Sequence, residues 1–432
     1  MNFEHAIWVV ILGLLLGGMA FSARAESSEM RLQQADMAKR SAKLNYPKLP
    51  EEVVEAKSVG PAVGPKVDSG LAQDWALTTI GFFDVFNPLV QPIQGKTKSC
   101  SNQVVVAVVD TGIDYTHSEL REHLWTNDGE TGAWKNPAGP LASCQDKSCN
   151  GIDDDHDGYV DDVIGWDFVH DVPLPYDTHG HGSHISGIIS ASASNGVGSS
   201  GVCPGVKIMS LKYYDSSGFG YNNLQNTVRA FHYAIRHGAN IINYSGGGAD
   251  PAPAERKAVE AAKAKNILVV AAAGNEGRNN DKLPYFPASY PVDNVVGVAS
   301  IDRNEDLLPS SNFGEAVTIA APGLSIMSSL PRGRFGMMSG TSQATAFVTG
   351  AAALLLSQAP DISKITYTQL KQWLVAGARP LKPSKDAEDI KAKPTKLVAS
   401  GILSLPGSLR AQSQSVKSPV LATPEIARKS RH

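Results

Sequence analysis

Short apolar segments recur along the middle of the chain, separated by segments with helical periodicity. The apolar segments are continuous and mostly rich in Val and Ile, which is typical of strands buried on both faces of a sheet. We predict strands at Val104–Val109, Val206–Leu211, Ile241–Asn243, Ile267–Ala273 and Val295–Val298.

Helical patterns lie between and after these strands. The first pattern ends at Gly238 and has apolar residues at Leu224, Val228, Phe231 and Ile235. Pro253–Lys265 repeats it, and Leu370–Val375 fits a later helix. This alternation predicts a parallel sheet with right-handed crossovers and helices on both faces. Active groups should then gather beyond the carboxyl ends of the strands.

The segment Gly336–Leu356 begins with a Gly-Thr-Ser turn and continues in small residues that would let a helix pack closely. Ser342 stands at the expected helix N-terminus, where unpaired N–H groups and the helix dipole favour an oxyanion. On this segment alone, Ser342 is either an N-cap residue or a nucleophile. The apolar run from Ala344 is shorter than the ~20 residues that a membrane span needs.

Residues 1–25 have the pattern of a signal peptide. The apolar run Ala6–Phe21 is followed by Ser-Ala-Arg-Ala, an A-x-A cleavage pattern, so the mature chain should begin near Glu26. The residues before the run include Glu4 and His5 but no Lys or Arg. An uncleaved signal anchor is therefore the alternative.

The rest of the chain divides into three parts. Residues 26–70 are polar, with a short amphipathic helix pattern at Glu29–Leu44, and are interpreted as an arm or a short pro-segment. Residues 71–411 form the predicted globular domain, which closes with a strand or turn at Gly401–Ala411. Residues 412–432 are polar and are predicted to be disordered.

Composition agrees with a soluble globular protein. Of the 432 residues, 19% are charged and 42% are hydrophobic, and the formal net charge is −3. This balance gives no electrostatic reason to expect binding to nucleic acid or to acidic membranes.

Export would make the four cysteines candidates for two disulfides. Three pairings are possible. The favoured pairs are Cys144–Cys149, which would close a short polar loop, and Cys100–Cys203, whose members each stand just ahead of an apolar strand. A metal site is a weaker alternative because no C-x-x-C pair occurs.

Four polar residues stand at the ends of predicted elements. Asp110 follows the strand VVVAVV, and Asn275 follows ILVVAAAG. His181 lies in HGHGSHISGII, where a helix begins, and Ser342 begins the helix described above. A serine nucleophile needs an imidazole to take its proton, and the imidazole needs a carboxylate to fix its tautomer. A side-chain amide can complete an oxyanion hole.

These four sequences, in this order, closely resemble the motifs of the subtilisin-like serine peptidases, or subtilases. The motifs are VVDTGID, HGSH, AAAGNEG and SGTSQAT, and the resemblance covers residues 71–411. It implies a three-layer α/β/α fold with a mainly parallel central sheet. It also implies that Asp110 orients the imidazole and that His181 is general base and then general acid. Ser342 would be the nucleophile, and Asn275 would help to hold the oxyanion.

The resemblance also implies where substrate binds. Ser245, Gly246 and Gly247 match the segment that pairs with an extended substrate and lines its main side-chain pocket. The segment around Gly218 matches the opposing edge of the cleft. Gly246 replaces a larger residue and should open the pocket, whereas Tyr285 would narrow it. No specificity is predicted from these opposed effects.

The chain departs from the family pattern at three further positions. Ser183 replaces a Thr, Gln343 replaces a Met, and Ala346 stands where a Pro is common. None of these changes removes a catalytic group, although Ala346 alters the start of the helix.

An acidic loop within an insertion near residues 144–168 predicts a calcium site. Positions one, three, five, seven and nine of an EF-hand-type loop match Asp153, Asp155, Asp157, the carbonyl of Tyr159, and Asp161. Position twelve is Ile164 and not Glu, which excludes a complete EF-hand. Hard oxygen ligands at this density favour Ca²⁺ over a solvated acidic loop, and the insertion resembles one found in many subtilases. Glu119 with Asn195 is a weaker second candidate.

Other functions have less support. His179, His181 and His184 form H-x-H-x-x-H, which resembles the metal-binding run of metallo-β-lactamase-type hydrolases. Ser183 stands where that run has Asp, and the sequence offers no second ligand cluster. A lipolytic α/β-hydrolase needs a G-x-S-x-G motif, which the sequence lacks. A catalytically silent binding protein with a subtilisin-like fold is the remaining alternative.

We therefore expect a calcium-stabilised serine endopeptidase that is secreted or periplasmic. It should act on polypeptides as a monomer and bind no nucleic acid. It should not bind a membrane after signal cleavage.

Overall fold

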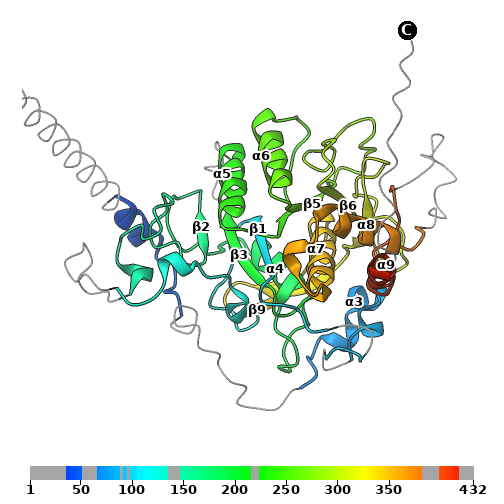
Figure 1. Ribbon diagram of the computed structural model, residues 1–432, viewed down its shortest axis with the longest axis horizontal. Helices are drawn as coiled ribbons and strands as arrows, with labels where there is room; N and C mark the ends of the chain where they lie inside the picture. Colours follow the sequence, from blue (N-terminus) through cyan, green and yellow to red (C-terminus); the bar gives the residue numbers. More distant parts are fainter. Residues whose placement is uncertain are drawn as a thin grey trace, which may run out of the picture.

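The protein is represented by a computed structural model, which describes residues 36–50, 66–87, 91–94, 98–134, 146–215, 223–381 and 398–417. The predicted signal peptide and residues 418–432 lie outside the described residues. A seven-stranded parallel sheet has the order β2-β3-β1-β4-β5-β6-β7 (Figure 1). Its strands are β1 Val105–Asp110, β2 Gly165–Asp167, β3 Lys207–Lys212, β4 Ile241–Tyr244, β5 Leu268–Ala272, β6 Val295–Ile301 and β7 Ile319–Pro322.

All five predicted strands are confirmed, and each end lies within three residues of the prediction. The sequence pattern missed both edge strands and the antiparallel hairpin of β8 Ile326–Leu330 and β9 Arg334–Met338. The edge strand β2 is only three residues long, Gly-Trp-Asp, and β7 ends at Pro322. Neither offers the long apolar run that identifies a central strand.

Helices cover both faces of the sheet and complete three layers (Figure 1). The helices are α3 Trp75–Thr79, α4 His181–Ser190, α5 Asn223–Arg236, α6 Pro253–Ala264, α7 Thr341–Gln358, α8 Tyr367–Gly377 and α9 Leu405–Lys417. Side chains of β1 alternate between the faces: Val106 and Val108 pack with α4 and α7, whereas Ala107 and Val109 pack with α5 and α6. The predicted α/β/α architecture is therefore confirmed.

Helix α7 is the buried centre of one layer. Every residue from Thr341 to Ser357 is buried. A Cβ atom added at Gly350 would lie 2.7 Å from Cβ of Val202, so the helix touches its neighbour where it has no side chain. The small residues of this segment thus allow the close packing that the sequence predicted.

The C-terminal prediction is wrong at residues 405–417. Ile402 forms a single bridge to Ala320, but a helix, α9, then runs to Lys417 and passes the predicted start of the disordered tail. Leu405, Leu409 and Gln412 are buried along one face, and the Gln412 amide donates to the Leu355 carbonyl at 2.9 Å. Pro406 lies in the first turn, where its missing N–H is not needed.

The N-terminal arm contains the predicted helix in part. Residues 36–44 are helical and residues 29–35 lie outside the described ranges. The segment 36–50 packs against the domain, with Met37 and Leu49 in contact with its two main cores.

One predicted disulfide is confirmed. Cys100 and Cys203 are bonded, with 5.5 Å between their Cα atoms, and they join the chain just before β1 to the chain just before β3. Cys149 is also disulfide-bonded, but Cys144 lies outside the described residues.

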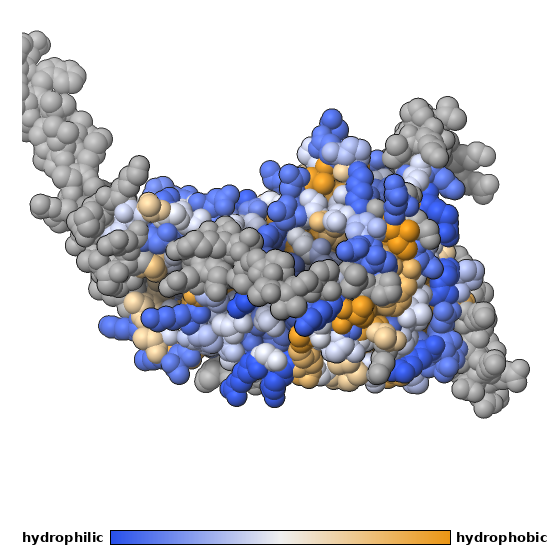
Figure 2. Space-filling model, turned by 90° about the horizontal axis from the view of Figure 1, so that it is seen from below, coloured by the Kyte–Doolittle hydropathy of each residue, from blue (hydrophilic) through white to orange (hydrophobic). Residues whose placement is uncertain are grey.

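The described surface is mixed in polarity. On the face in Figure 2, hydrophobic residues form small patches among hydrophilic ones. Among the described helices, none has the length and apolar character to cross a bilayer.

Candidate active site

The predicted catalytic residues lie at the carboxyl edge of the parallel sheet. Asp110 is the last residue of β1, and His181 is the first residue of α4. Asn275 follows β5 by three residues, and Ser342 lies in the first turn of α7. In open α/β sheets this edge is where ligands bind.

Asp110 and His181 form a short hydrogen bond. The Asp110 Oδ1 atom lies 2.7 Å from His181 Nδ1, and the same oxygen accepts from the Thr111 N–H at 2.8 Å. Burial disfavours the charged imidazolium, but the charge and hydrogen bond of Asp110 outweigh burial and raise the pKa of His181. Nδ1 therefore carries the proton, and Nε2 is left to act as a base.

Two glycines allow this contact. A Cβ atom at Gly182 would lie 2.1 Å from the Gly112 carbonyl oxygen. A Cβ atom at Gly112 would lie 2.4 Å from the Pro175 carbonyl oxygen. The start of α4 can therefore lie directly on the loop after β1 only because side chains are missing at both positions.

Asp177 was missed by the sequence analysis. It binds the backbone on both sides of His181. This buried carboxylate accepts from the N–H groups of Gly180 and Ser183, at 2.7 and 2.8 Å, and from the Thr111 hydroxyl at 2.9 Å. Thr111 in turn accepts from the Gly182 N–H at 2.9 Å. Asp177 lies four residues before the helix start and Gly180 is the N-cap, so the usual capping signal did not identify it.

Ser183 belongs to the same network. Its hydroxyl donates to Asp177 Oδ2 at 2.7 Å and accepts from the Asp114 N–H at 2.9 Å. A Thr at this position would offer the same hydroxyl, so the departure from the family pattern keeps the contact.

Ser342 is held by Ser245, the residue that follows β4. Its hydroxyl donates to the Ser245 carbonyl oxygen at 3.1 Å, and the Ser245 hydroxyl donates to the Ser342 carbonyl oxygen at 3.2 Å. Within the part of the chain that the structure describes, no hydrogen bond joins Ser342 to His181. Such contacts commonly form only when a substrate is bound.

Asn275 lies beside the Gly-Thr-Ser turn. Its Oδ1 atom accepts from the Thr341 N–H at 2.9 Å and from the Thr341 hydroxyl at 3.2 Å. Because the carbonyl end is held in this way, the exposed amide nitrogen is the end available to an oxyanion.

The predicted substrate segment contacts two tyrosines. A Cβ atom at Gly246 would lie 2.2 Å from the Tyr213 hydroxyl oxygen, so Tyr213 occupies the space that the missing side chain leaves. Cβ atoms at Gly247 and Gly274 would lie 2.6 and 2.9 Å from ring carbons of Tyr285. The Tyr285 ring therefore lies between the backbone of the substrate segment and the backbone before Asn275. Gly218 lies outside the described residues.

The three histidines of the H-x-H-x-x-H pattern are separated in role. His179 is exposed, and His181 pairs with Asp110. His184 is buried, with Nε2 2.9 Å from the Ile326 carbonyl oxygen, and burial lowers its pKa to about 4. Among the described residues, the clusters able to hold a metal do not include them.

The acidic loop brings together part of the predicted calcium set. Both oxygens of Asp153 accept backbone N–H groups, from Asp157 at 3.0 Å and from Gly158 at 2.8 Å. Asp161 accepts from the Gly151 N–H, and the ring of Tyr159 packs on Trp166. These contacts form a tight turn but do not by themselves gather the predicted ligands at one point.

Asp155 lies in two groups of close ligand atoms. One contains the predicted Asp157 and also His237, and the second, which the sequence analysis missed, contains Glu130 and Asp162. Carboxylate oxygens of Glu130, Asp155 and Asp162 lie within 4.8 Å of one another, and the Asn127 amide bridges the two aspartates at 2.9 and 3.1 Å. Burial raises the pKa of Glu130 to about 8 and that of Asp162 to about 9. Two buried carboxylates beside an exposed one fit a hard cation, because carboxylate oxygen is the ligand that Ca²⁺ prefers.

The weaker candidate pair is also in contact. Asn195 donates to one oxygen of the buried Glu119 at 2.6 Å, and the other Glu119 oxygen has no hydrogen-bond partner among the described residues.

The sequence that forms this site matches a known protein family. The model of the subtilase family matches residues 101–403. The chain belongs to the subtilase family. The match spans the four positions at the carboxyl edge of the sheet, and it begins after the N-terminal arm.

Several proteins that are similar in sequence have names of serine proteinases or subtilisins. A thermophilic serine proteinase of Bacillus sp. (strain AK1) is 35% identical over 61% of this chain and 54% of its own length. Thermitase of Thermoactinomyces vulgaris is 37% identical over 50% of this chain and 75% of its own length. Subtilisin E of Bacillus subtilis (strain 168) is 31% identical over 72% of this chain and 70% of its own length. Together with the family match, these relatives support a serine endopeptidase.

A solved structure agrees in fold. A cold adapted subtilisin-like serine proteinase superposes with a TM-score of 0.54 and 23% identity, over 76% of this chain and 98% of that chain. This subtilase therefore shares the arrangement of the sheet and its covering helices with known members.

The Asp110–His181 pair predicts a defined pH dependence. His181 must be neutral to accept a proton, so kcat/KM should fall as the pH falls through its raised pKa. Asp110→Asn removes the charge that raises this pKa, so the acidic limb of the pH profile should move to lower pH. Because the tautomer is also lost, kcat should fall about 10⁴-fold. Asp302→Asn, at an exposed turn, is the matched control. An unchanged acidic limb in Asp110→Asn would contradict the assignment.

Proposed function

We propose that this subtilase is an exported endopeptidase that hydrolyses polypeptides through an acyl-enzyme formed on Ser342. The observation that carries the proposal is the 2.7 Å contact between Asp110 and His181 at the sheet edge that also bears Ser342 and Asn275. Export rests on the signal-peptide pattern of residues 1–25 and on the family, many of whose members are secreted.

In the proposed mechanism, the Ser342 hydroxyl oxygen attacks the carbonyl carbon of the scissile peptide. His181 Nε2 takes the hydroxyl proton, and the Asp110 charge stabilises the imidazolium. The Asn275 amide and the Ser342 N–H donate to the oxyanion. The imidazolium then gives its proton to the leaving amine, and a water molecule, activated by the same imidazole, releases the acyl group.

A catalytically silent binding protein is the alternative function. It has no need for a carboxylate that raises the pKa of a histidine beside a serine. It would also not require the buried Asp177 network that supports the histidine. The complete set of four catalytic groups therefore favours an enzyme.

The pocket beside the substrate segment favours small side chains. Tyr213 occupies the space above Gly246, and Tyr285 lies between Gly247 and Gly274. Two aromatic side chains thus take up room beside the strand that would bind the residue before the scissile bond. We therefore expect Gly, Ala or Ser to be preferred at that substrate position.

We also propose that the acidic insertion binds calcium, with Asp155 as a central ligand. Glu130 and Asp162 would complete one group that the structure brings together, and Asp157 lies with Asp155 in the other. Asp153, Tyr159 and Asp161 are the further ligands that the loop spacing predicts. A divalent cation would stabilise the buried carboxylates in their charged form and tie the insertion to β2 and α5. Calcium is thus assigned a structural role.

Removal of the nucleophile should abolish activity. Ser342→Ala should lower casein hydrolysis by about 10⁶-fold and prevent covalent labelling by a fluorophosphonate, because it removes the hydroxyl that the proposed mechanism acylates. Intact mass spectrometry measures the labelling, and Ser339→Ala, at an exposed serine three residues earlier, is the control. Labelling that persists in Ser342→Ala would refute the assignment.

Removal of the Tyr285 ring should open the pocket. Tyr285→Ala should raise kcat/KM for peptides with Phe or Leu before the scissile bond by about tenfold or more, relative to peptides with Ala. Tyr285→Phe keeps the ring and should leave the ratio unchanged. Equal preferences in the two variants would show that Tyr285 does not shape the pocket.

Calcium should stabilise the fold measurably. At saturating Ca²⁺ the melting temperature of the Ser342→Ala chain should exceed that in excess chelator by about 5–10 °C. Asp155→Asn should remove most of this difference in melting temperature. Glu260→Gln, which changes an exposed side chain of α6, should keep it. Glu130→Gln and Asp153→Asn then show which of the two ligand groups binds the ion. Identical melting curves with and without chelator would contradict the proposal.

A further inference from the structure

The N-terminal segment 36–50 is attached to the domain at several points. Figure 1 shows it in dark blue against the end of the molecule that carries β2. Arg40 Nη1 donates to the His170 carbonyl oxygen at 3.2 Å and lies 3.4 Å from Asp171 Oδ2. Farther along, the Tyr115 hydroxyl donates to the Pro47 carbonyl oxygen at 2.6 Å. The segment therefore touches both β2 and the loop that follows Asp110.

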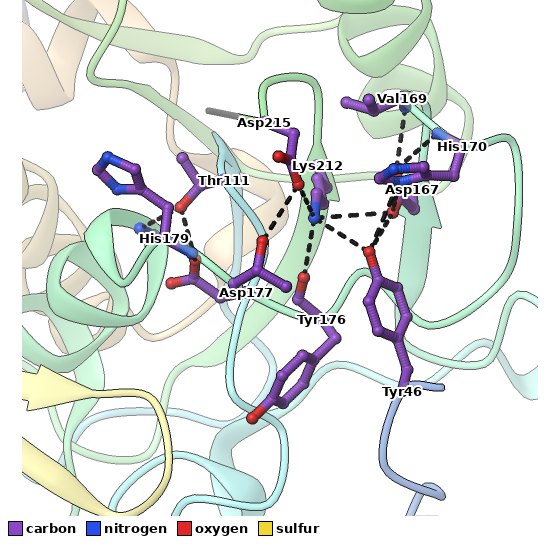
Figure 3. Close-up of polar contacts among 12 residues, drawn as sticks. Tyr46, Thr111, Asp167, Val169, His170, Tyr176, Asp177, His179, Lys212 and Asp215 are labelled. Carbon is purple, nitrogen blue, oxygen red and sulfur yellow. Dashed lines mark hydrogen bonds and ion pairs between the residues drawn. The ribbon is translucent and has the colours of Figure 1, made fainter. Parts of the chain in front are cut away.

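The central contact of the segment is with a buried lysine. Lys212, the last residue of β3, has no exposed side-chain surface. Its ammonium lies 2.9 Å from Asp215 Oδ2, 3.1 Å from the Tyr176 carbonyl oxygen and 3.2 Å from the Tyr46 hydroxyl (Figure 3). An ammonium has three N–H donors, and here each has one acceptor. One of the three acceptors comes from the N-terminal segment.

Tyr46 also contacts a carboxylate of this cluster, that of Asp167. Its hydroxyl donates to Asp167 Oδ2 at 3.3 Å while it accepts from Lys212, whose ammonium lies 3.9 Å from the same carboxylate oxygen. The His170 ring nitrogen lies 2.8 Å from that oxygen. Burial and the nearby Asp167 and Asp215 charges raise the pKa of Tyr46, so the phenol stays neutral and keeps its proton to donate.

The lysine cluster continues to the start of α4. Asp215 accepts from the Thr178 hydroxyl at 3.1 Å. Thr178 follows Asp177, whose carboxylate holds the backbone N–H of Gly180, immediately before His181.

The other neighbours of Lys212 reach the same site. In the sheet, Lys212 is paired in register with Asp110. Tyr176 forms a bridge with Ile113 in the loop after Asp110. Tyr46 and Tyr115 both pack on the Tyr176 ring, with centroids 5.6 and 5.4 Å away. The segment thus contacts the loop after Asp110, through Tyr115, and the chain that leads into α4, through Tyr176.

We propose that residues 36–50 form a strap that stays bound to the peptidase domain in the active enzyme and positions the Asp110–His181 pair. Tyr46 is the positioning residue, because it satisfies the third donor of Lys212 and closes the cluster from outside. The strap binds in cis, but its contacts would hold it in place after a cut between residues 50 and 66. The kinetic part of this proposal rests on the proposed peptidase function, whereas the binding part does not.

The binding part is tested in a chain that cannot cleave itself. In full-length Ser342→Ala protein, a recognition site for a sequence-specific protease is placed within residues 51–65 and cut. The strap fragment should co-elute with the domain in size-exclusion chromatography and appear with it in native mass spectra. The added change Tyr46→Ala should release it. A fragment that separates from an otherwise unchanged domain overturns the proposal.

The positioning part is tested by removal of one oxygen atom. Tyr46→Phe keeps the ring over Lys212 but leaves a buried N–H without an acceptor, so the melting temperature should fall by about 3–6 °C. Well below that temperature, kcat should fall about tenfold with KM changed less than about twofold, because bound substrate meets a misplaced base. Tyr367→Phe is the matched control. It removes a tyrosine hydroxyl on α8 that donates to Asp293, and it should change neither the melting temperature nor kcat.

The outcomes separate the two proposals. A lower melting temperature with unchanged kcat in Tyr46→Phe would make the strap structural only and overturn the positioning role. Absence of peptidase activity in the unmodified chain would refute the proposed function but leave the fragment-binding result standing. An active secreted enzyme that contains no residues 36–50 would overturn the proposal that the strap stays bound in the active enzyme.

Discussion

The site depends on the close approach of three backbone segments. The loop after β1, the stretch ending at Asp177 and the start of α4 meet around Gly112 and Gly182, where an added Cβ would collide with a carbonyl oxygen in each case. This approach brings Asp110 within 2.7 Å of His181 and lets Asp177 and Thr111 bind the same helix start. A shift of 1 Å in such a contact is enough to cost about 10²-fold in rate. The glycines are therefore part of the catalytic geometry although they have no chemistry of their own.

Two histidines on α4 show what the carboxylate adds. Both His181 and His184 lie where burial disfavours a charged ring. His184 faces backbone carbonyls, and burial lowers its pKa to about 4. His181 faces Asp110, whose charge reverses the direction and raises the pKa. One turn of helix thus separates a histidine fixed as neutral from one that can take and return a proton. The difference arises from the partner that each ring meets.

The sequence was sufficient for the central strands and for the placement of the candidate catalytic residues at the ends of elements, because both are local patterns. Continuous Val and Ile runs identify buried strands, and Asp110 and Asn275 follow those runs directly. Contacts between distant segments were not visible. Glu130 joins Asp155 across the acidic insertion, Asp177 binds Thr111 across the sheet edge, and Tyr46 reaches Lys212 over more than a hundred residues. Short edge strands and α9 were missed because their patterns are too brief or too polar to stand out.

The hydrogen bond of Ser342 links substrate binding to activation. The hydroxyl donates to the Ser245 carbonyl, on the segment expected to bind the substrate strand. To become a nucleophile it must leave this acceptor for His181 Nε2. The exchange replaces one hydrogen bond with another, so its net cost is about 1 kcal/mol or less. A bound peptide that excludes water would favour the imidazole, because the proton then has no other strong acceptor. In the proposed mechanism, Ser342 thus stays bound to the residue after β4 until a substrate at this edge brings its hydroxyl to His181.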